Sequence, residues 1–395
     1  MYLDFTPAQC DFRDELRGSF ERLISPRRDE LEREMRTRSE GGGPVYRGIL
    51  EVLGAEGLLG IGWPREFGGQ GRGPIEQYIF TEEIQRTGFP LPFLTLNTVG
   101  PTTMRYGSAE QKQRFLPPIL QGRLQVAIGY SEAEAGTDLA GLKTRAERHA
   151  DGWLINGAKM WTSLADHADY VWLAARTDPK APKHRGISIF MIPTSLPGFK
   201  CTPIMTIGGV RTNATWYEDV VVPAENLIGV ENHGWSLITG QLNEERVSLS
   251  NYSALEELLD DAIRWARDAK LVDGRRVIDQ PWVQSNLARV YAKPQALRLM
   301  NYKLAWSAQQ RVVHPADASA VKVFGSEFYV EAYRALLECM GPLGTVQDGS
   351  PGAILRGRVE RNYRNTLILT FGGGTNEIQR DIIAMAALGM PHYKN

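Results

Sequence analysis

One carboxylate lies inside an otherwise apolar helical stripe, and it is the first candidate for chemistry in this sequence. Steps of three and four residues along the chain pass through Trp235, Ile238, Leu242, Glu245, Leu249 and Tyr252. At helical spacing Glu245 falls within the apolar arc, whereas Glu244 falls about 100° away on the solvent side. A carboxylate among apolar neighbours is costly unless it is paired or functional, and desolvation raises its pKa toward the range of a general base. The alternative is a structural salt bridge to a neighbour such as Arg246.

Three loops combine small residues with hydroxyl groups. They are Gly129–Asp138 (GYSEAEAGTD), Lys159–Ser163 (KMWTS) and Phe371–Arg380 (FGGGTNEIQR). Glycine lets a backbone approach a ligand closely, and three glycines before a helix N-terminus form a ready anion site. Taken singly, each loop is more typical of an ordinary loop than of a ligand site.

The elements that must position these residues occur in the order α, β, α. Helical spacing predicts helices over 11–24, 75–86, 235–270, 282–311, 316–338, 352–365 and 376–388. Runs rich in Val, Ile, Trp, Tyr and Thr predict strands over 124–131, 142–149, 153–161, 170–176, 187–193 and 215–222, with Asp151-Gly152 and Asn156-Gly157 as turn pairs. We therefore expect an α+β protein with a β domain in the middle.

Composition excludes several classes of function. The 395 residues carry 45 Lys+Arg against 46 Asp+Glu, and this net charge of −1 does not suit non-specific nucleic-acid binding. The three cysteines are widely spaced and the six histidines form no HxH or HxxxH pair, so neither a disulfide framework nor a metal site is expected. No apolar run is long enough to span a membrane, and the N-terminal segment mixes acids and bases unlike a signal peptide. A cytoplasmic protein is the expectation.

Together and in this order, the loops resemble motifs of the acyl-CoA dehydrogenases. Ser131–Asp138 matches the family's TEPxAGSD, Lys159–Ser163 its KxWIT, Val222–Gly229 its VPxxNLLG, and Gly374–Arg380 its GTxEIQR. The resemblance runs from end to end of the chain. It implies a helical N-terminal domain (1–123), a β-barrel-like middle domain (124–232) and a C-terminal four-helix bundle (233–395).

The resemblance also implies a cofactor and roles for individual residues. The cofactor is FAD, and its expected contacts are Ile128, Tyr130, Ser131, Thr137, Trp161, Thr162, Ser163, Gly374, Thr375 and Glu377. Thr137, Arg246 and Gly373 are the expected substrate contacts. The implied reaction is α,β-dehydrogenation of an acyl-CoA thioester, in which a base removes the α-proton and the β-hydride moves to flavin N5. The thioester carbonyl then needs hydrogen-bond donors for its developing charge, and the resemblance implies the Gly373 backbone N–H as one of them.

Two departures from the family pattern indicate which subgroup of the family this chain resembles. Most members carry the base where this chain has Gly373, but a minority place it in an LxxER pattern, which Leu242–Arg246 matches, so Glu245 is the expected base. The family's RxxFG arm, which reaches the FAD of a neighbouring subunit, is missing from 274–281, although Arg275 or Arg276 could replace it. The chain in these respects resembles the glutamate-bearing subunit of actinobacterial α2β2 steroid side-chain acyl-CoA dehydrogenases.

These patterns predict an FAD-dependent dehydrogenase that acts on a bulky acyl-CoA, most simply a steroid side-chain thioester. Its expected partners are a sister subunit in a heterotetramer and an electron acceptor such as electron-transfer flavoprotein. One alternative is a homotetrameric enzyme for branched or long acyl chains. Another is a structural partner subunit without catalysis, against which Glu245, Trp161 and Thr375 argue.

Overall fold

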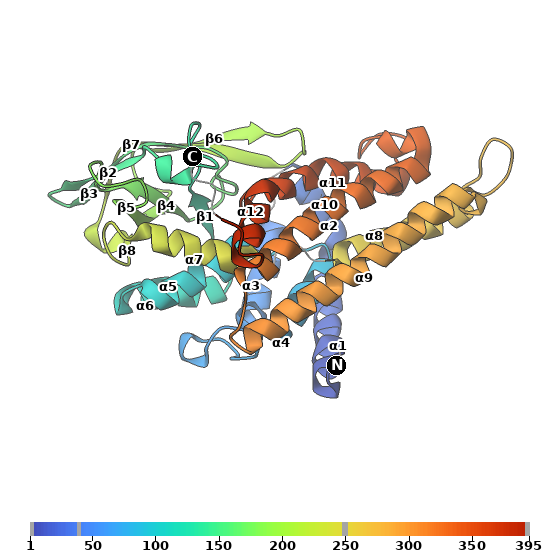
Figure 1. Ribbon diagram of the computed structural model, residues 1–395, viewed down its shortest axis with the longest axis horizontal. Helices are drawn as coiled ribbons and strands as arrows, with labels where there is room; N and C mark the ends of the chain where they lie inside the picture. The colour runs from blue at the N-terminus through green and yellow to red at the C-terminus, as the bar shows by residue number, and fades with distance from the viewer. Residues whose placement is uncertain (1–3, 38–40, 247–251, 392–395) are drawn as a thin grey trace.

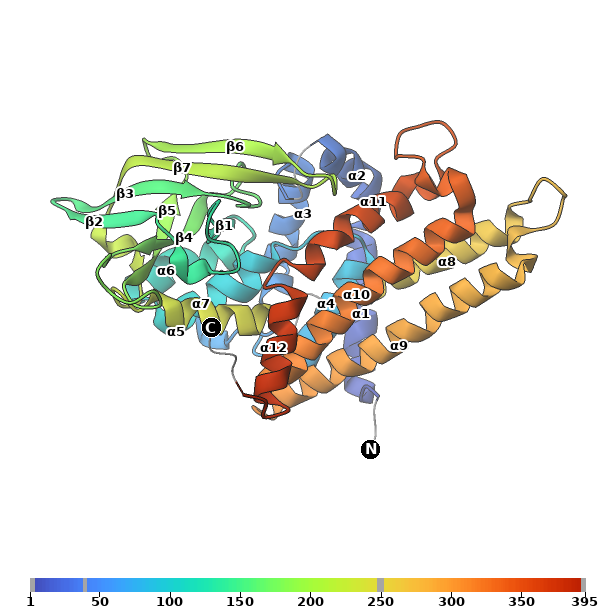
Figure 2. The same ribbon diagram turned by 45° about the horizontal axis from the view of Figure 1, so that its top comes forward.

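A computed structural model describes residues 4–37, 41–246 and 252–391. Helices precede and follow one eight-stranded sheet, which confirms the expected α+β class. Figures 1 and 2 show the sheet at one end of the molecule and the long C-terminal helices at the other. The exact division into domains after residues 123 and 232 stays a prediction.

The N-terminal helices begin where the sequence supplies caps. Their bounds are α1 (Pro7–Leu23), α2 (Arg28–Thr37), α3 (Pro44–Ala55), α4 (Pro74–Arg86), α5 (Gly100–Tyr106) and α6 (Ala109–Leu120). Thr6 and Gln9 form a capping box at α1, and Ser108 and Gln111 form another at α6. Proline occupies the first turn of α3 and α4, where its missing N–H costs nothing.

The sheet is formed by β1 (Val126–Gly129), β2 (Arg145–His149), β3 (Gly152–Lys159), β4 (Tyr170–Arg176), β5 (Ile187–Pro193), β6 (Phe199–Met205), β7 (Arg211–Val222) and β8 (Leu227–Ile228). Its order is β6-β7-β3-β2-β4-β5-β8, and β1 pairs in parallel with β4. Strands β4 and β5 are buried along almost their whole length, which explains their continuous apolar sequence. The sequence patterns missed β6 and β8.

The predicted turn at Asn156-Gly157 is wrong. Both residues lie inside β3, where the register against β7 shifts between Ile155 and Gly157. Gly157 has φ +150°, and a Cβ at this position would lie 2.6 Å from the Thr144 hydroxyl oxygen. A dipeptide that favours positive φ therefore makes a bulge within a strand here, while Asp151-Gly152 does connect β2 to β3.

The C-terminal helices are α7 (Gly234–Arg246), α8 (Ser253–Asp268), α9 (Pro281–Gln309), α10 (Pro315–Met340), α11 (Arg358–Thr366) and α12 (Asn376–Ala386). The single helix predicted over 235–270 is therefore wrong, because it is divided between α7 and α8. The two helices have different neighbours: α7 packs on β5 and α10, whereas α8 packs on α4, α9 and α10. The apolar spacing of the sequence continues into α8, so it did not reveal that a second helix begins at Ser253.

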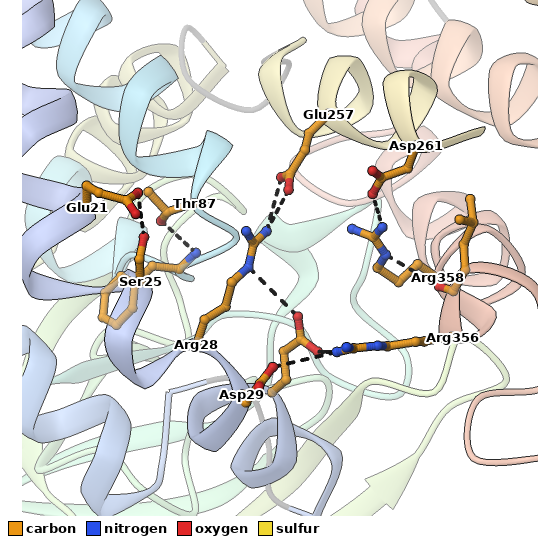
Figure 3. A network of polar contacts seen from close by, with 12 residues as sticks. Glu21, Ser25, Arg28, Asp29, Thr87, Glu257, Asp261, Arg356 and Arg358 are labelled. Atoms are coloured by element: carbon orange, nitrogen blue, oxygen red, sulfur yellow. Dashed lines mark hydrogen bonds and ion pairs between the residues drawn. The ribbon is translucent and has the colours of Figure 1, made fainter. Parts of the chain in front are cut away.

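Ion pairs join the N-terminal helices to the C-terminal ones (Figure 3). Arg28 of α2 lies 2.8 Å from the Glu257 carboxylate of α8, and Arg356 lies 3.6 Å from Asp29. Beside them, Asp261 of α8 pairs with Arg358 of α11, which joins two of the C-terminal helices to each other. Because most of these groups are partly exposed, each pair contributes little alone, and their effect is to fix how the helices are aligned.

Candidate active site

The first predicted flavin loop leaves the sheet from β1. Ile128 lies opposite Trp172 of β4 in the parallel register and is half-buried. Tyr130 and Ser131 follow directly and are also half-buried, whereas Thr137 lies farther along the loop and is exposed. The structure therefore places four expected flavin contacts along one loop, with its first half anchored to the sheet.

The second predicted loop leaves the sheet from β3, and Trp161 is its most unusual residue. Trp161 has φ +63° and its side chain is 56% exposed. Thr162 is fully buried, and its backbone N–H and C=O bond to Asn213 at 2.9 and 3.1 Å. The Ser163 hydroxyl lies 3.2 Å from that of Thr212. A buried anchor thus holds a strained, exposed indole, a combination typical of functional sites.

The structure brings these two loops together. The Met160 backbone N–H donates to the Ser131 carbonyl at 2.8 Å, and Lys159 Nζ donates to the Tyr130 carbonyl at 3.0 Å. Lys159 Nζ also lies 2.8 Å from Glu132 Oε1. Both loops therefore share one buried polar cluster, although they are separated in the sequence.

The fully buried Lys159 and the half-buried Glu132 form an ion pair that the sequence patterns did not reveal. Glu132 also accepts backbone N–H bonds from Lys143 and Thr144 at 2.6 and 2.8 Å. Burial alone would raise the pKa of Glu132, but the Lys159 charge and these hydrogen bonds outweigh it, so the pKa is lowered. Burial lowers the pKa of Lys159 to about 8, against the attraction of Glu132. Both groups are therefore charged near neutral pH.

The third predicted loop leads into α12. Gly373 and Gly374 have φ +67° and +93°, which a side chain would disfavour. Thr375 caps α12, since its hydroxyl accepts from the Ile378 N–H at 3.3 Å. Glu377 is exposed in the first turn, and its pKa is lowered by its own backbone N–H and then by the Thr375 hydroxyl. The turn therefore presents backbone groups at a helix N-terminus.

Lys322 of α10 binds this turn through hydrogen bonds, and the sequence patterns did not predict its role. Its side chain is buried, and its Nζ donates to the Gly374 carbonyl at 2.8 Å and to Asn376 Oδ1 at 2.7 Å. The Asn376 amide donates to Ser326 at 3.0 Å. No signal in the sequence distinguishes Lys322 from a solvated lysine, because its partners lie more than 50 residues away.

The expected base and its neighbour lie in the last turn of α7. Glu245 and Arg246 belong to this helix, but their side chains lie outside the described part of the structure, as does Leu249 altogether. Tyr252 is buried and occupies the N-cap position of α8, without a capping bond from its side chain. The stripe that singled out Glu245 therefore extends beyond α7, and the assignment of the base stays a prediction. In both ribbon views α12 lies beside the C-terminal end of α7.

Arg275 and Arg276 lie in the loop between α8 and α9. Arg275 lies 2.6 Å from Asp273, and Arg276 lies 2.8 Å from Asp279, so each guanidinium is paired within its own loop. Both ribbon views place this loop at the end of the molecule opposite the sheet. Within one chain, neither arginine is near the two loops of the sheet.

The described residues fit a flavin. Trp161 offers an exposed apolar ring face, Ser131 and Ser163 offer half-buried hydroxyls, and Gly373 and Gly374 offer a turn without side chains. A planar, amphipathic ring system needs this mixture of apolar face and polar edge. In the described part of the chain, no group of three or more His, Cys, Asp and Glu side chains is arranged to hold a metal ion.

The chain belongs to the acyl-CoA dehydrogenase family. Models of the family's N-terminal, middle and C-terminal domains match residues 6–123, 127–220 and 232–388. The chain is 52% identical to acyl-CoA dehydrogenase FadE26 of Mycobacterium tuberculosis over 99% of both chains. Its fold is similar to the ChsE4-ChsE5 complex from Mycobacterium tuberculosis (TM-score 0.92, 52% identity, 100% of both chains) and to the Tcur3481-Tcur3483 steroid ACAD (TM-score 0.91, 46% identity, 100% of both chains).

Membership of this family makes the chain an oxidoreductase of a flavoprotein class. The helical and sheet regions expected from the motifs agree with the three family domains. None of the helices in the described residues is both long and apolar enough to cross a membrane.

Proposed function

We propose that this chain is the base-bearing subunit of an FAD-dependent dehydrogenase that oxidises a bulky acyl-CoA, a steroid side-chain thioester. The observation that carries the proposal is the joining of the 130–137 and 161–163 loops through Lys159, in a chain that has Gly373 where most family members have their base. Likeness to proteins whose names include "steroid ACAD" supports the substrate class.

In this proposal each loop has a separate task. Ile128, Tyr130, Ser131 and Thr137 line one edge of the flavin, Trp161 packs beside its ring, and Thr162 and Ser163 complete the second edge. FAD, when bound, supplies the acceptor for the β-hydride. Gly374, Thr375 and Glu377 contact the rest of the cofactor. The buried Lys159–Glu132 pair fixes the two sheet loops relative to each other.

The chemistry of the chain's own residues centres on Glu245 and Gly373. Glu245 takes the α-proton of the acyl group, and the Gly373 N–H donates to the thioester carbonyl as negative charge develops there. Lys322 contributes by holding the following carbonyl, that of Gly374, at 2.8 Å. Thr137 and Arg246 are proposed substrate contacts.

The absence of a side chain at Gly373 supports a bulky substrate. A glutamate at this position would occupy space beside the acyl group in most family members, and its transfer to α7 leaves that wall without a side chain. We therefore infer that the enzyme accepts a branched or polycyclic acyl group. A panel of acyl-CoA thioesters should give the highest kcat/KM with steroid side-chain substrates, and a preference for butyryl- or palmitoyl-CoA would contradict the inference.

The decisive test of the base is Glu245→Gln. The variant should keep the fold and the flavin but lose flavin reduction by acyl-CoA by several orders of magnitude, because nothing else proposed here can take the α-proton. Glu244→Gln is the matched control, since it removes the adjacent carboxylate, and it should be close to wild type. Equal reduction rates in Glu245→Gln and wild type would return the base to another residue.

We also propose a sister subunit and an electron acceptor such as electron-transfer flavoprotein. The related solved structures named above are two-protein complexes. Arg275 and Arg276 are already paired with acids at the end of the chain opposite the sheet, so neither serves the flavin loops of its own chain. Expression of the chain alone should give weak flavin retention that co-expression of a sister subunit restores. A fully active homotetramer with one FAD per chain would contradict the partner requirement.

A further inference from the structure

A buried hydrogen-bonded chain connects the first flavin loop to the helix that carries Glu245. Trp172 Nε1 of β4 lies 3.0 Å from the Tyr130 hydroxyl oxygen, and the same hydroxyl bonds to Gln241 Oε1 of α7. Trp172 is fully buried and Gln241 is 1% exposed. Tyr130 and Gln241 are 111 residues apart in the sequence, so this contact is purely tertiary.

Donor and acceptor rules fix the direction of this chain. An indole N–H can only donate, so the phenol oxygen of Tyr130 accepts it. The phenol proton is then left for Gln241 Oε1, which accepts it. The Gln241 amide nitrogen is buried and bonds to nothing in the described part of the chain, so the side-chain carbonyl is the group through which Gln241 makes the connection. The connection therefore depends on the Tyr130 hydroxyl and on the Gln241 side-chain carbonyl.

Gln241 is the last residue of α7 whose side chain the structure describes, and it precedes Glu245 by one helical turn. Toward the start of the helix, Gly234 lies so close to β5 that a Cβ would meet the Ile187 carbonyl at 2.9 Å. Leu237 and Ile238 are buried in the core. The helix is thus held by packing in its first half and by a directional hydrogen bond near Glu245.

We propose that Gln241 is a positioning residue: through Tyr130 and Trp172 it fixes the Glu245 turn of α7 at a set distance from the flavin loop. The inference rests on the proposed roles of Glu245 and of the Tyr130 loop. A base and a hydride acceptor must be correctly placed at the same time, and an error of about 1 Å costs on the order of a hundredfold in rate. A helix held only by apolar packing can shift along its contact more easily than a helix that is also held by a directional hydrogen bond.

The test compares Gln241→Met and Tyr130→Phe with the control Thr239→Val. Each test variant keeps the approximate volume and removes one hydrogen-bonding group of the connection. Thr239 is exposed on α7, and within the described residues its hydroxyl bonds only to the backbone of its own helix. Two measurements are made on the holoenzyme, with a sister subunit where one is needed. The first is the rate and KM of flavin reduction by acyl-CoA, and the second is amide hydrogen exchange over residues 235–246.

Gln241→Met should lower the reduction rate by about ten- to a hundredfold with little change in KM or flavin content. Tyr130→Phe should lower the rate by at least as much, and its flavin content is measured separately because Tyr130 is also a proposed flavin contact. Exchange in α7 should be faster than in Thr239→Val. The double variant should be no worse than the more damaging single variant, because both changes break one connection. This non-additivity separates the connection from two unrelated packing defects.

Three results would overturn the proposal. Exchange as slow as in Thr239→Val would mean that the connection does not hold α7, and faster exchange at an unchanged rate would mean that holding it does not position the base. Additive losses in the double variant would mean two separate effects. If none of the acyl-CoA thioesters reduces the flavin of the wild-type protein, the proposed function fails. Hydrogen exchange in the single and double variants still decides whether Gln241 and Tyr130 hold α7.

Discussion

Lys159 Nζ lies 2.8 Å from Glu132 Oε1, and Lys159 is completely buried. The pair joins the end of β3 to the loop after β1, and these two segments carry Trp161 and Ser131. An exposed pair would have little influence on either loop, whereas a buried pair restrains both, because removing one partner leaves a desolvated charge. The first prediction follows from this difference.

Lys159→Met should destabilise the protein by about 2 to 4 kcal/mol, because it leaves the half-buried Glu132 carboxylate without its cation, with only the N–H bonds of Lys143 and Thr144. It should also weaken flavin retention, since the Tyr130 carbonyl loses its donor. Lys143→Met is the matched control, because Lys143 pairs with Glu134 in full exposure. Chemical denaturation and the flavin absorbance of purified protein measure both effects. Equal stability of the two variants would contradict the prediction.

Glu82 of α4 predicts a dependence of stability on pH. It is 4% exposed, its Oε2 accepts from the Ser253 hydroxyl of α8 at 2.7 Å, and Arg86, Glu83 and Glu256 are the charged groups nearest to it. Burial raises its pKa to about 8 from an ordinary 4.5. Between these values the folded state binds more protons than the unfolded state, so the free energy of unfolding falls as pH rises.

Glu82→Gln should remove this slope. Relative to wild type, the variant should gain about 3 to 5 kcal/mol between pH 4.5 and pH 8, because the amide resembles the neutral acid at every pH. Denaturation midpoints across this pH range, with Glu51→Gln on the exposed side of α3 as control, measure the gain. A constant difference between Glu82→Gln and wild type would show that Glu82 is ionised or neutral throughout.

Lys322→Met tests how the turn before α12 is held. The Gly374 carbonyl and Asn376 Oδ1 would both lose a charged donor, at a cost of about 1.5 to 3 kcal/mol for each bond. The reduction rate should fall together with stability, because the Gly373 N–H is proposed to face the thioester. Lys303→Met, which removes a lysine paired with Asp317 on the surface, should leave both quantities near wild type. An unchanged rate in a folded Lys322→Met protein would contradict the proposed role of the turn.

Gly157→Ala tests the bulge in β3. The new Cβ would lie 2.6 Å from Thr144 Oγ1 and 2.7 Å from its Cα at a φ that alanine disfavours. We expect a loss of about 2 to 4 kcal/mol in the free energy of unfolding. Gly18→Ala in α1 is the control, because a Cβ there meets nothing within 4 Å, and helix propensity predicts no loss. Similar thermal midpoints for the two variants would contradict the strain at Gly157.

The parts of the fold that sequence patterns predicted best are those set by burial on both faces. Strands β4 and β5 have the predicted bounds, because continuous apolar runs bounded by polar residues have few other solutions. Strand β6 was missed because Lys200, Thr202 and Pro203 interrupt it, and as the outermost strand it is largely exposed. Edge strands tolerate this composition, so their sequences carry little signal.

The candidate site was predicted in its loops but not in what holds them. Hydroxyl and glycine clusters mark the loops locally, and Trp161, Ser163 and Thr375 lie on them as expected. Gln241 and Lys322 are buried polar residues whose partners lie 111 and 52 positions away, and spacing along one chain does not reveal such contacts. The sequence around Gln241 and around Lys322 is what one would also find around a solvent-exposed glutamine or lysine.

The division between α7 and α8 also separates two hydrophobic cores. Leu237 and Ile238 of α7 pack in one core with the N-terminal helices and β1, whereas Tyr252 and Leu255 begin a second core with α9 and α10. Local opening of a protein follows such cooperative units. Opening of the second core would remove the contacts of α7 with α10 but leave its packing on β5 and in the first core. We therefore expect the turn of the proposed base Glu245 and the predicted flavin loop after β1 to open and close as one unit.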